Sequence, residues 1–242
     1  MKLLLLSNST NSGEAYLGWT EPFIKSFLEK NQIKKVLFFP FAGVNLSDKS
    51  LTKSYDLYEE KVAAVFQGWG VEITSVHHAS DPISVLHSAE CIAVGGGNTF
   101  HLVAELHRLG LMEAIRDRAL VGVPFMGWSA GSNVACPTLR TTNDMPIIQP
   151  ASFDCLNLIP FQINPHYLDA NPAGHGGETR QQRIEEFQAI NRDIVVVGLR
   201  EASLISVDGS EARLEGYKPM RVFEYGKNPV ELKPGSDLSH LL

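Results

Sequence analysis

Short apolar runs alternate along the chain with longer segments in which apolar side chains recur every three or four positions. Continuous apolar runs are typical of strands that are buried on both faces of a sheet, and the longer segments predict amphipathic helices. This alternation predicts an α/β fold with a mostly parallel sheet and helices on both faces. The predicted strands are residues 3–6, 36–39, 71–76, 91–94, 123–128 and 194–199, and the predicted helices are residues 14–30, 50–67, 82–88, 99–108, 111–120 and 179–190.

The pattern loosens after Ser129. Residues 137–178 contain six prolines and many Asn, Thr and Gly residues, which predicts a functional loop rather than long helices. Order returns with a capping box, Thr179 with Gln182, at the start of the last predicted helix. Residues 204–207 and 221–225 are predicted to be short antiparallel strands. Because no repeat or compositional break divides the chain, we expect residues 1–242 to form a single domain.

Composition narrows the functional classes. The 242 residues are 44% apolar and 20% charged, and 21 basic against 27 acidic side chains give a net charge of −6. Disordered and coiled-coil proteins are excluded, and a core of ordinary size is available. The acidic balance, without a block of Lys and Arg, argues against a nucleic-acid binder or a protein of acidic membrane surfaces.

Cysteine usage and the length of the apolar runs bear on the compartment. Three widely spaced cysteines, Cys91, Cys136 and Cys155, form neither a disulfide framework nor a CxxC metal site. The apolar run at residues 3–6 is shorter than the core of a signal peptide, which needs about 7–15 residues, and no run reaches the ~20 residues of a membrane span. We therefore expect a cytoplasmic protein.

The sharpest motif is Gly127-Trp128-Ser129-Ala130-Gly131, which matches G-x-S-x-G and follows a predicted strand. In a nucleophile elbow, the glycines two residues before and after the serine let the backbone turn tightly and expose the hydroxyl. The backbone N–H groups that follow point to the same space and favour developing negative charge. The alternative is an ordinary strand-to-helix turn with a capping serine, and the context favours the nucleophile.

A serine nucleophile needs a base, and the chain has eight histidines. Six of them are better interpreted as solvated or packed side chains: His77, His78, His87, His101, His107 and His240. His175 is flanked by glycines that cannot hold it in place. His166 follows Pro165, which stiffens the backbone, so we predict His166 as the general base.

Two carboxylates could orient that base. Asp144 lies in Thr141-Thr142-Asn143-Asp144-Met145-Pro146, where its alternative use is to hydrogen-bond the backbone of a turn. Glu201 comes just after a predicted strand, at the edge of the sheet where active-site groups gather, and its alternative is an ion pair with Arg200. The sequence leaves this choice open.

Two further features fit such a site. Gly95-Gly96-Gly97 ends a predicted strand and could form a phosphate loop, a tight turn or, beside Ser129, a backbone oxyanion hole. Its spacing matches neither common phosphate-loop motif. Arg180 and Arg183 lie in a first helical turn, where cations are disfavoured, so they are either carboxylate-binding or ordinary surface arginines.

Seven segments together resemble peptidase E, the α-aspartyl dipeptidase family, and the resemblance runs from Met1 to about Val207. They are Ser7-Asn8-Ser9-Thr10, Phe39-Pro40-Phe41-Ala42-Gly43, Gly95-Gly96-Gly97-Asn98-Thr99-Phe100, Gly127-Trp128-Ser129-Ala130-Gly131, Thr141-Thr142-Asn143-Asp144-Met145-Pro146, Ile163-Asn164-Pro165-His166 and Gly177-Glu178-Thr179-Arg180. The resemblance implies a flavodoxin-like three-layer sandwich, similar to class I glutamine amidotransferases. It also implies cleavage of dipeptides with an N-terminal aspartate by a serine mechanism, without metal or cofactor.

The resemblance also implies roles for individual residues. Ser129 becomes the nucleophile and His166 the base, Asp144 matches an aspartate implicated in activity, and Glu201 falls where related serine hydrolases supply a glutamate. Arg200 and Ala202 depart from the Pro and Gly expected around that glutamate. Gly96, Gly97 and Ala130 are expected to hold the oxyanion, and Arg180, with Asn98 and Thr99, the aspartate side chain of the substrate.

Several alternatives remain. A cyanophycinase-like β-aspartyl exopeptidase and a non-catalytic binding module on the same fold are both compatible with these motifs. A glutamine amidotransferase would have cysteine at position 129, and an α/β-hydrolase would usually place its histidine late in the chain, so both are discounted. The expected partner is a small dipeptide, with no nucleic acid or membrane, and the expected state is a monomer or a homodimer.

Overall fold

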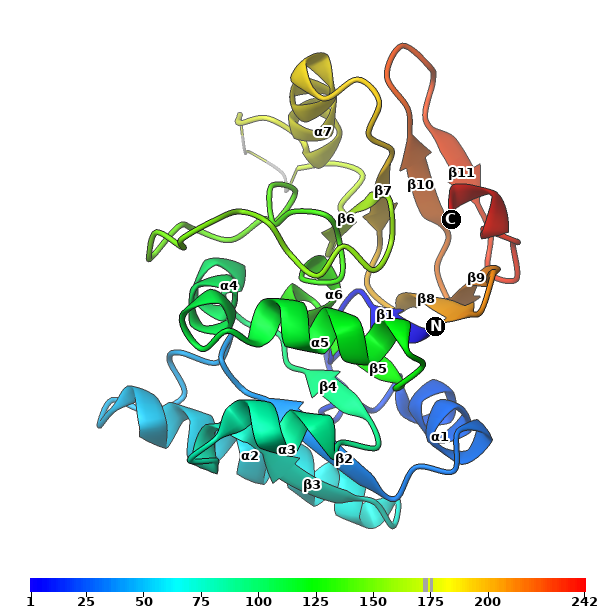
Figure 1. The fold of residues 1–242 in the computed structure, drawn as a ribbon. Coiled ribbons are helices and arrows are strands. Elements are labelled where there is room, and N and C mark those ends of the chain that lie inside the picture. The colour runs from blue at the N-terminus through cyan, green and yellow to red at the C-terminus, as the bar shows by residue number, and fades with distance from the viewer. Residues whose placement is uncertain (172–173, 175) are drawn as a thin grey trace.

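In a computed structural model, which describes residues 1–171, 174 and 176–242, the chain forms two sheets with helices around them (Figure 1). The strands are β1 Lys2–Leu6, β2 Lys35–Phe39, β3 Glu72–Ser75, β4 Ile92–Val94, β5 Phe125–Trp128, β6 Gln162–Pro165, β7 Val196–Leu199, β8 Ser203–Asp208, β9 Glu211–Gly216, β10 Met220–Phe223 and β11 Val230–Leu232. The α-helices are α1 Glu21–Lys30, α2 Leu51–Gly68, α3 Pro82–His87, α4 Thr99–Arg108, α5 Leu111–Leu120, α6 Ala130–Asn133 and α7 Arg180–Ile190, with 3₁₀ turns η1 Val76–His78 and η2 Ser239–Leu241.

The larger sheet has seven strands in the order β3-β2-β4-β5-β1-β8-β9. Its first five strands are parallel, and β8 and β9 join antiparallel. Side chains alternate across it: Leu4, Leu6 and Phe38 face the core beneath α1 and α2, and Leu3 and Leu5 face the core beneath α3, α4 and α5. The predicted sandwich, a mostly parallel sheet between two helical layers, is confirmed.

A second sheet, in the order β11-β10-β7-β6, lies beside the first and carries α7 (Figure 1). The sequence analysis predicted residues 137–178 to be loop, but β6 lies within them and pairs in parallel with β7. β9 and β11 were also not predicted. β9 alternates buried Ala212 and Leu214 with charged residues that face outward, so it lacks the continuous apolar run of a central strand.

The predicted helix 14–30 is wrong in its first part. The helix begins at Glu21, because Leu17 has a φ of 59° and cannot continue a right-handed helix. Pro22 in the first turn suits this start, since its missing N–H would have no helical partner there. The helices 99–108 and 111–120 are confirmed to the residue. In the part of the chain that the structure describes, no helix combines the length and apolarity that a membrane span requires.

Candidate active site

Ser129 lies at the turn between β5 and α6, as the G-x-S-x-G motif predicts. Its backbone has φ 55° and ψ −111°, a conformation that residues with side chains rarely adopt. A Cβ atom on Gly127 would lie 2.2 Å from the Gly131 carbonyl oxygen, and one on Gly131 would lie 2.0 Å from the Val94 carbonyl oxygen. Both positions therefore require glycine, and the elbow is confirmed.

The elbow is fixed to the end of β1. The Ser129 N–H donates to the Leu6 carbonyl at 3.0 Å. The buried Ser132 hydroxyl lies 2.7 Å from the Leu6 carbonyl oxygen and 2.9 Å from that of Gly127. These hydrogen bonds fix the backbone of the turn to β1 and β5, so they place Ser129 at the carboxyl edge of the sheet.

His166 comes from the other sheet, directly after β6. Its Nε2 lies 2.9 Å from Ser129 Oγ. The backbone N–H of His166 donates to the Ser7 hydroxyl at 2.9 Å, and that hydroxyl donates to the Leu199 carbonyl at 2.8 Å. Asn143 donates to the Pro165 carbonyl at 2.7 Å. The imidazole is therefore held on a fixed backbone, as a general base must be.

Glu201 supplies the carboxylate that contacts His166. Its Oε1 lies 2.8 Å from His166 Nδ1, and its side chain is half exposed. Glu201 follows β7, the strand that pairs with β6, so the two residues emerge side by side from neighbouring strands. Ala202, where the family pattern has glycine, adopts a φ of 63°, and its N–H donates to Asn8 Oδ1 at 2.9 Å. Glu201 therefore contacts His166 although Ala202 departs from the glycine that the resemblance implies.

Asp144 does not orient His166, so that alternative of the sequence analysis is wrong. Its Oδ2 accepts from the Thr99 N–H at 2.7 Å, the Thr99 hydroxyl at 2.6 Å and the Thr142 hydroxyl at 3.1 Å. The carboxylate lies at the N-terminus of α4, where the helix dipole favours negative charge. All three donors reach Oδ2, and Oδ1 makes no hydrogen bond among the described residues, while Asp144 itself lines the cavity.

Unpaired backbone N–H groups lie beside Ser129. The N–H groups of Gly96, Gly97 and Ala130 donate to no acceptor within the described residues, whereas that of Asn98 donates to Ala42 at 2.9 Å. A Cβ on Gly96 would lie 3.0 Å from Ser129 Cβ, which shows how closely the two backbones approach. Free donors packed against a nucleophilic hydroxyl can stabilise an oxyanion.

Ser129, His166 and Asp144 line one cavity of about 550 Å³. Its wall also contains Tyr16, Tyr58 and Lys61, which the sequence analysis missed. The Tyr58 hydroxyl donates to the Gly96 carbonyl at 2.9 Å and accepts from the Trp128 indole at 3.0 Å, so it fixes the glycine turn. The Lys61 ammonium lies 4.0 Å above the Tyr16 ring. No local motif marks these residues, because Tyr58 and Lys61 reach the cavity through the packing of α2, and Tyr16 reaches it from the segment between β1 and α1.

Four other histidines contact groups outside the catalytic centre. His101 is buried against the Phe41 carbonyl at 2.8 Å, and His107 lies 2.9 Å from the Asp154 carbonyl. His77 and His78 contact Asp56 on the far side of α2 from Tyr58. His175, the base that the sequence analysis set aside, lies outside the described residues.

Along most of its length the chain is similar to a known peptidase family. Residues 3–215 match the model of "Peptidase family S51". The chain belongs to peptidase family S51. It is 48% identical over 241 residues to peptidase E of a Nostoc species, covering 100% of this chain and 96% of the relative. It is 46% identical over 235 residues to peptidase E of Salmonella typhimurium, covering 97% and 99%.

A solved structure gives the same fold. A peptidase from an acI-B1 Actinobacterium superposes with a TM-score of 0.69 at 18% identity, covering 98% of this chain and 96% of that one. The expected family and the expected serine peptidase class are confirmed by the family model and the two relatives, and the solved structure confirms the fold.

The residues expected to bind substrate are used differently from the prediction. The Asn98 amide donates to the Met145 carbonyl at 2.9 Å, and its oxygen caps α4. Thr99 holds Asp144. Asn98 thus lines the cavity of this S51 peptidase and Thr99 is buried behind it, and the polar atoms of both side chains are already engaged within the protein.

Arg180 begins α7, behind the predicted capping box, which is confirmed. It is half-buried and makes no hydrogen bond or ion pair with the residues that the structure describes. Burial, and then the neighbouring Arg183, lower the pKa of the Arg180 guanidinium, while the nearby Asp144 carboxylate raises it. Arg183 instead pairs at 3.8 Å with Glu178. The two arginines therefore differ. Arg183 pairs with Glu178, whereas the charge of Arg180 interacts with that of Asp144.

Proposed function

We propose that this S51 peptidase is a dipeptidase that hydrolyses Asp-Xaa dipeptides through an acyl-enzyme on Ser129. The observation that carries the proposal is the continuous chain Ser129–His166–Glu201, with contacts of 2.9 and 2.8 Å, which opens onto a cavity of about 550 Å³ beside free N–H donors. Nucleophile, base and orienting carboxylate in this order are the arrangement that activates a serine hydroxyl.

In the first half-reaction, His166 Nε2 takes the proton of Ser129 Oγ while Oγ bonds to the carbonyl carbon of the substrate aspartate. The N–H groups of Gly96, Gly97 and Ala130 receive the oxyanion. The C–N bond then breaks, and the leaving amino acid takes the proton from His166. In the second half-reaction, water gives a proton to His166, attacks the aspartyl ester and releases Ser129 with its proton restored.

Charges around the cavity fit the three charged groups of an Asp-Xaa dipeptide. Arg180 would bind the side-chain carboxylate, and the free Oδ1 of Asp144 would receive the α-ammonium group. Lys61 would face the carboxylate of the second residue. Selectivity for aspartate follows, because a site built to pair a carboxylate leaves Arg180 without its partner when the substrate has none.

The nucleophile is tested with Ser129→Ala. Hydrolysis of Asp-Leu should fall by about 10⁴–10⁶-fold in kcat, because the Oγ that forms the ester is gone. A fluorophosphonate probe should label the wild-type chain at Ser129 and leave the variant unlabelled. Circular dichroism should be unchanged, because alanine preserves the packing. Labelling at another serine, or full turnover by the variant, would contradict the proposal and favour a binding module.

Substrate recognition is tested with Arg180→Met and a panel of dipeptides. The variant should lose Asp-Leu hydrolysis at least 100-fold more than residual Asn-Leu hydrolysis, because only the first substrate offers Arg180 a carboxylate. Amidated Asp-Leu should be cleaved more slowly than Asp-Leu. Arg183→Met is the matched control, with little expected effect. Equal losses on both substrates would overturn the role of Arg180, and preferred cleavage of β-Asp-Arg would indicate the cyanophycinase-like alternative.

We also propose the cytoplasm as the compartment. Cys91, Cys136 and Cys155 are all free and buried, which suits a chain kept in a reducing environment.

A further inference from the structure

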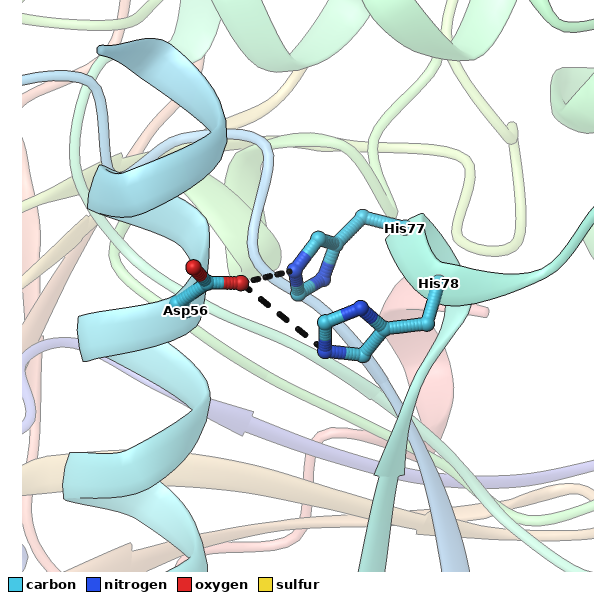
Figure 2. Close-up of side chains that lie close together, drawn as sticks. All are labelled: Asp56, His77 and His78. Carbon is cyan, nitrogen blue, oxygen red and sulfur yellow. Dashed lines mark hydrogen bonds and ion pairs between the residues drawn. The ribbon is translucent and has the colours of Figure 1, made fainter.

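A second cluster of chemically capable side chains lies away from the catalytic centre, where η1 meets α2. Across the described part of the chain, one group of three side chains of the metal-binding types brings its ligand atoms within 4.8 Å of one another: Asp56, His77 and His78. Figure 2 shows both imidazoles turned toward the Asp56 carboxylate, which projects from α2. His77 Nε2 lies 3.1 Å and His78 Nε2 3.9 Å from Asp56 Oδ1.

These separations match what a four-coordinate cation requires. Zn²⁺ bonds to imidazole nitrogen and carboxylate oxygen at about 2.0–2.2 Å, so neighbouring ligands of a tetrahedron lie ~3.3–3.5 Å apart. The two measured distances bracket that value. Glu59, one helical turn after Asp56 on α2, places Oε2 2.7 Å from His78 Nε2 at the edge of the cluster, and a movement of its side chain would bring it to the ion as a fourth ligand.

Hydrogen bonding presents the correct nitrogen of His77. The Ser75 hydroxyl lies 2.6 Å from His77 Nδ1 and 3.3 Å from the Phe38 carbonyl oxygen, and His77 Nε2 contacts Asp56 Oδ1 at 3.1 Å. With Nδ1 donating to the Ser75 hydroxyl and that hydroxyl donating to the Phe38 carbonyl, the Nε2 lone pair is available to a cation beside the Asp56 carboxylate. A backbone- or hydroxyl-bonded second nitrogen is typical of histidines that ligate metals.

The burial of these side chains and the packing of the two imidazole rings also favour a metal site. The His77 side chain is 4% exposed and that of Asp56 is 29% exposed, so the inner ligands are fixed while His78 leaves one side open to water. The two imidazole rings lie with centroids 3.8 Å apart.

We propose that Asp56, His77 and His78, with Glu59, form a binding site for a divalent transition-metal cation, with Zn²⁺ as the ion of choice. Two imidazoles and carboxylates suit Zn²⁺ and Co²⁺, and they do not suit Mg²⁺ or Ca²⁺, which prefer sites made of oxygen alone. The ion cross-links the η1 turn to α2, the helix whose Tyr58 and Lys61 line the catalytic cavity. Its role is to stabilise that helix position, and it takes no part in the peptidase chemistry.

The test is a titration of the full chain, stripped of metal, with Zn²⁺ and with Co²⁺. Calorimetry should show one site that is lost in Asp56→Asn and in His78→Ala. His87→Ala, which removes an exposed histidine on α3 outside the cluster, should leave that site unchanged. Bound Co²⁺ should show the visible absorption of a four- or five-coordinate ion. Excess Mg²⁺ should not displace it.

Stability gives a second readout that does not depend on catalysis. A ligand at about 100 times its Kd should raise the melting temperature of the wild-type chain by about 5 °C or more, and it should not raise that of His78→Ala. His166 and Glu201 offer zinc a second imidazole–carboxylate pair, so stoichiometry is compared between the variants rather than read from inhibition. Equal zinc stoichiometry in wild type and in Asp56→Asn/His78→Ala, or no binding at all, would overturn the proposal.

Discussion

At the scale of single residues, the candidate site concentrates unusual backbone angles. Ser129, His166 and Ala202 have φ values of 55°, 52° and 63°, in the left-handed region that favours glycine. Such conformations cost on the order of 1–3 kcal/mol each and persist only where surrounding contacts enforce them. Here the hydrogen bonds of these residues to Leu6, Ser7 and Asn8 do so. The end of β1 is therefore the common support of nucleophile, base and carboxylate.

The different roles of the Glu201 and Asp144 carboxylates can be tested by substituting each residue. Glu201→Gln should lower kcat for Asp-Leu by about 10²–10⁴-fold with a small change in KM, because the amide can no longer stabilise the charged His166 imidazole. Asp144→Asn should instead act mainly on KM, because Asp144 lines the cavity and makes no hydrogen bond with His166. The reverse assignment of kcat and KM effects would show that Asp144 orients the base.

At the scale of elements, the strand-to-helix turn depends on the absence of side chains. Gly131→Ala should destabilise the fold by about 2–3 kcal/mol or more, because its Cβ would lie 2.0 Å from the Val94 backbone oxygen, which cannot move without shifting β4. Urea unfolding measures this. Gly68→Ala is the matched control: nothing lies within 4 Å of its Cβ at the end of α2, so a gain of up to about 1 kcal/mol is expected. Equal effects of the two changes would contradict the steric argument.

Elements with strong local signals could be predicted, and those that depend on distant partners could not. The buried strands and the helices 99–108 and 111–120 are marked by their own apolar pattern. β6 is not, because Gln162, Asn164 and Pro165 are buried there through hydrogen bonds to the loop at Thr141 and pairing with β7. At the site, Ser129 and His166 are marked by glycine and proline neighbours, whereas the choice of Glu201 depended on which strand lies beside β6.

At the scale of the whole molecule, an ion-pair network ties the second sheet together next to Glu201. Arg200 Nη2 lies 2.6 Å from Asp169 Oδ1, and Arg200 Nη1 lies 3.0 Å from Glu231 Oε1. The Arg200 hydrogen bond holds the pKa of Asp169 below its usual value. Burial raises the pKa of Glu231, but Arg200 and Arg221 outweigh it and hold that pKa below its usual value as well.

This network predicts how stability depends on pH. Carboxyl groups with depressed pKa values stabilise the folded state above their unfolded pKa, about 4, and that contribution is lost as pH falls through the lower folded values. Arg200→Gln should therefore lower the free energy of unfolding most at pH 6–7, and the difference from wild type should shrink toward pH 2–3. Urea unfolding at several pH values measures this. Arg213→Gln, which removes an exposed pair with Glu211 at 3.9 Å, should have little effect at any pH. A difference that stays constant with pH would contradict the linkage.

The origin of the triad in two separate sheets has a consequence for the cell that makes this protein. The ribosome delivers Ser129 well before the segment that ends in Glu201, and domains fold largely as their strands emerge. A nascent chain that ends before β6 and β7 contains the serine, and it lacks both the imidazole and the carboxylate that act on it. The complete triad can therefore form only after most of the chain has been synthesised.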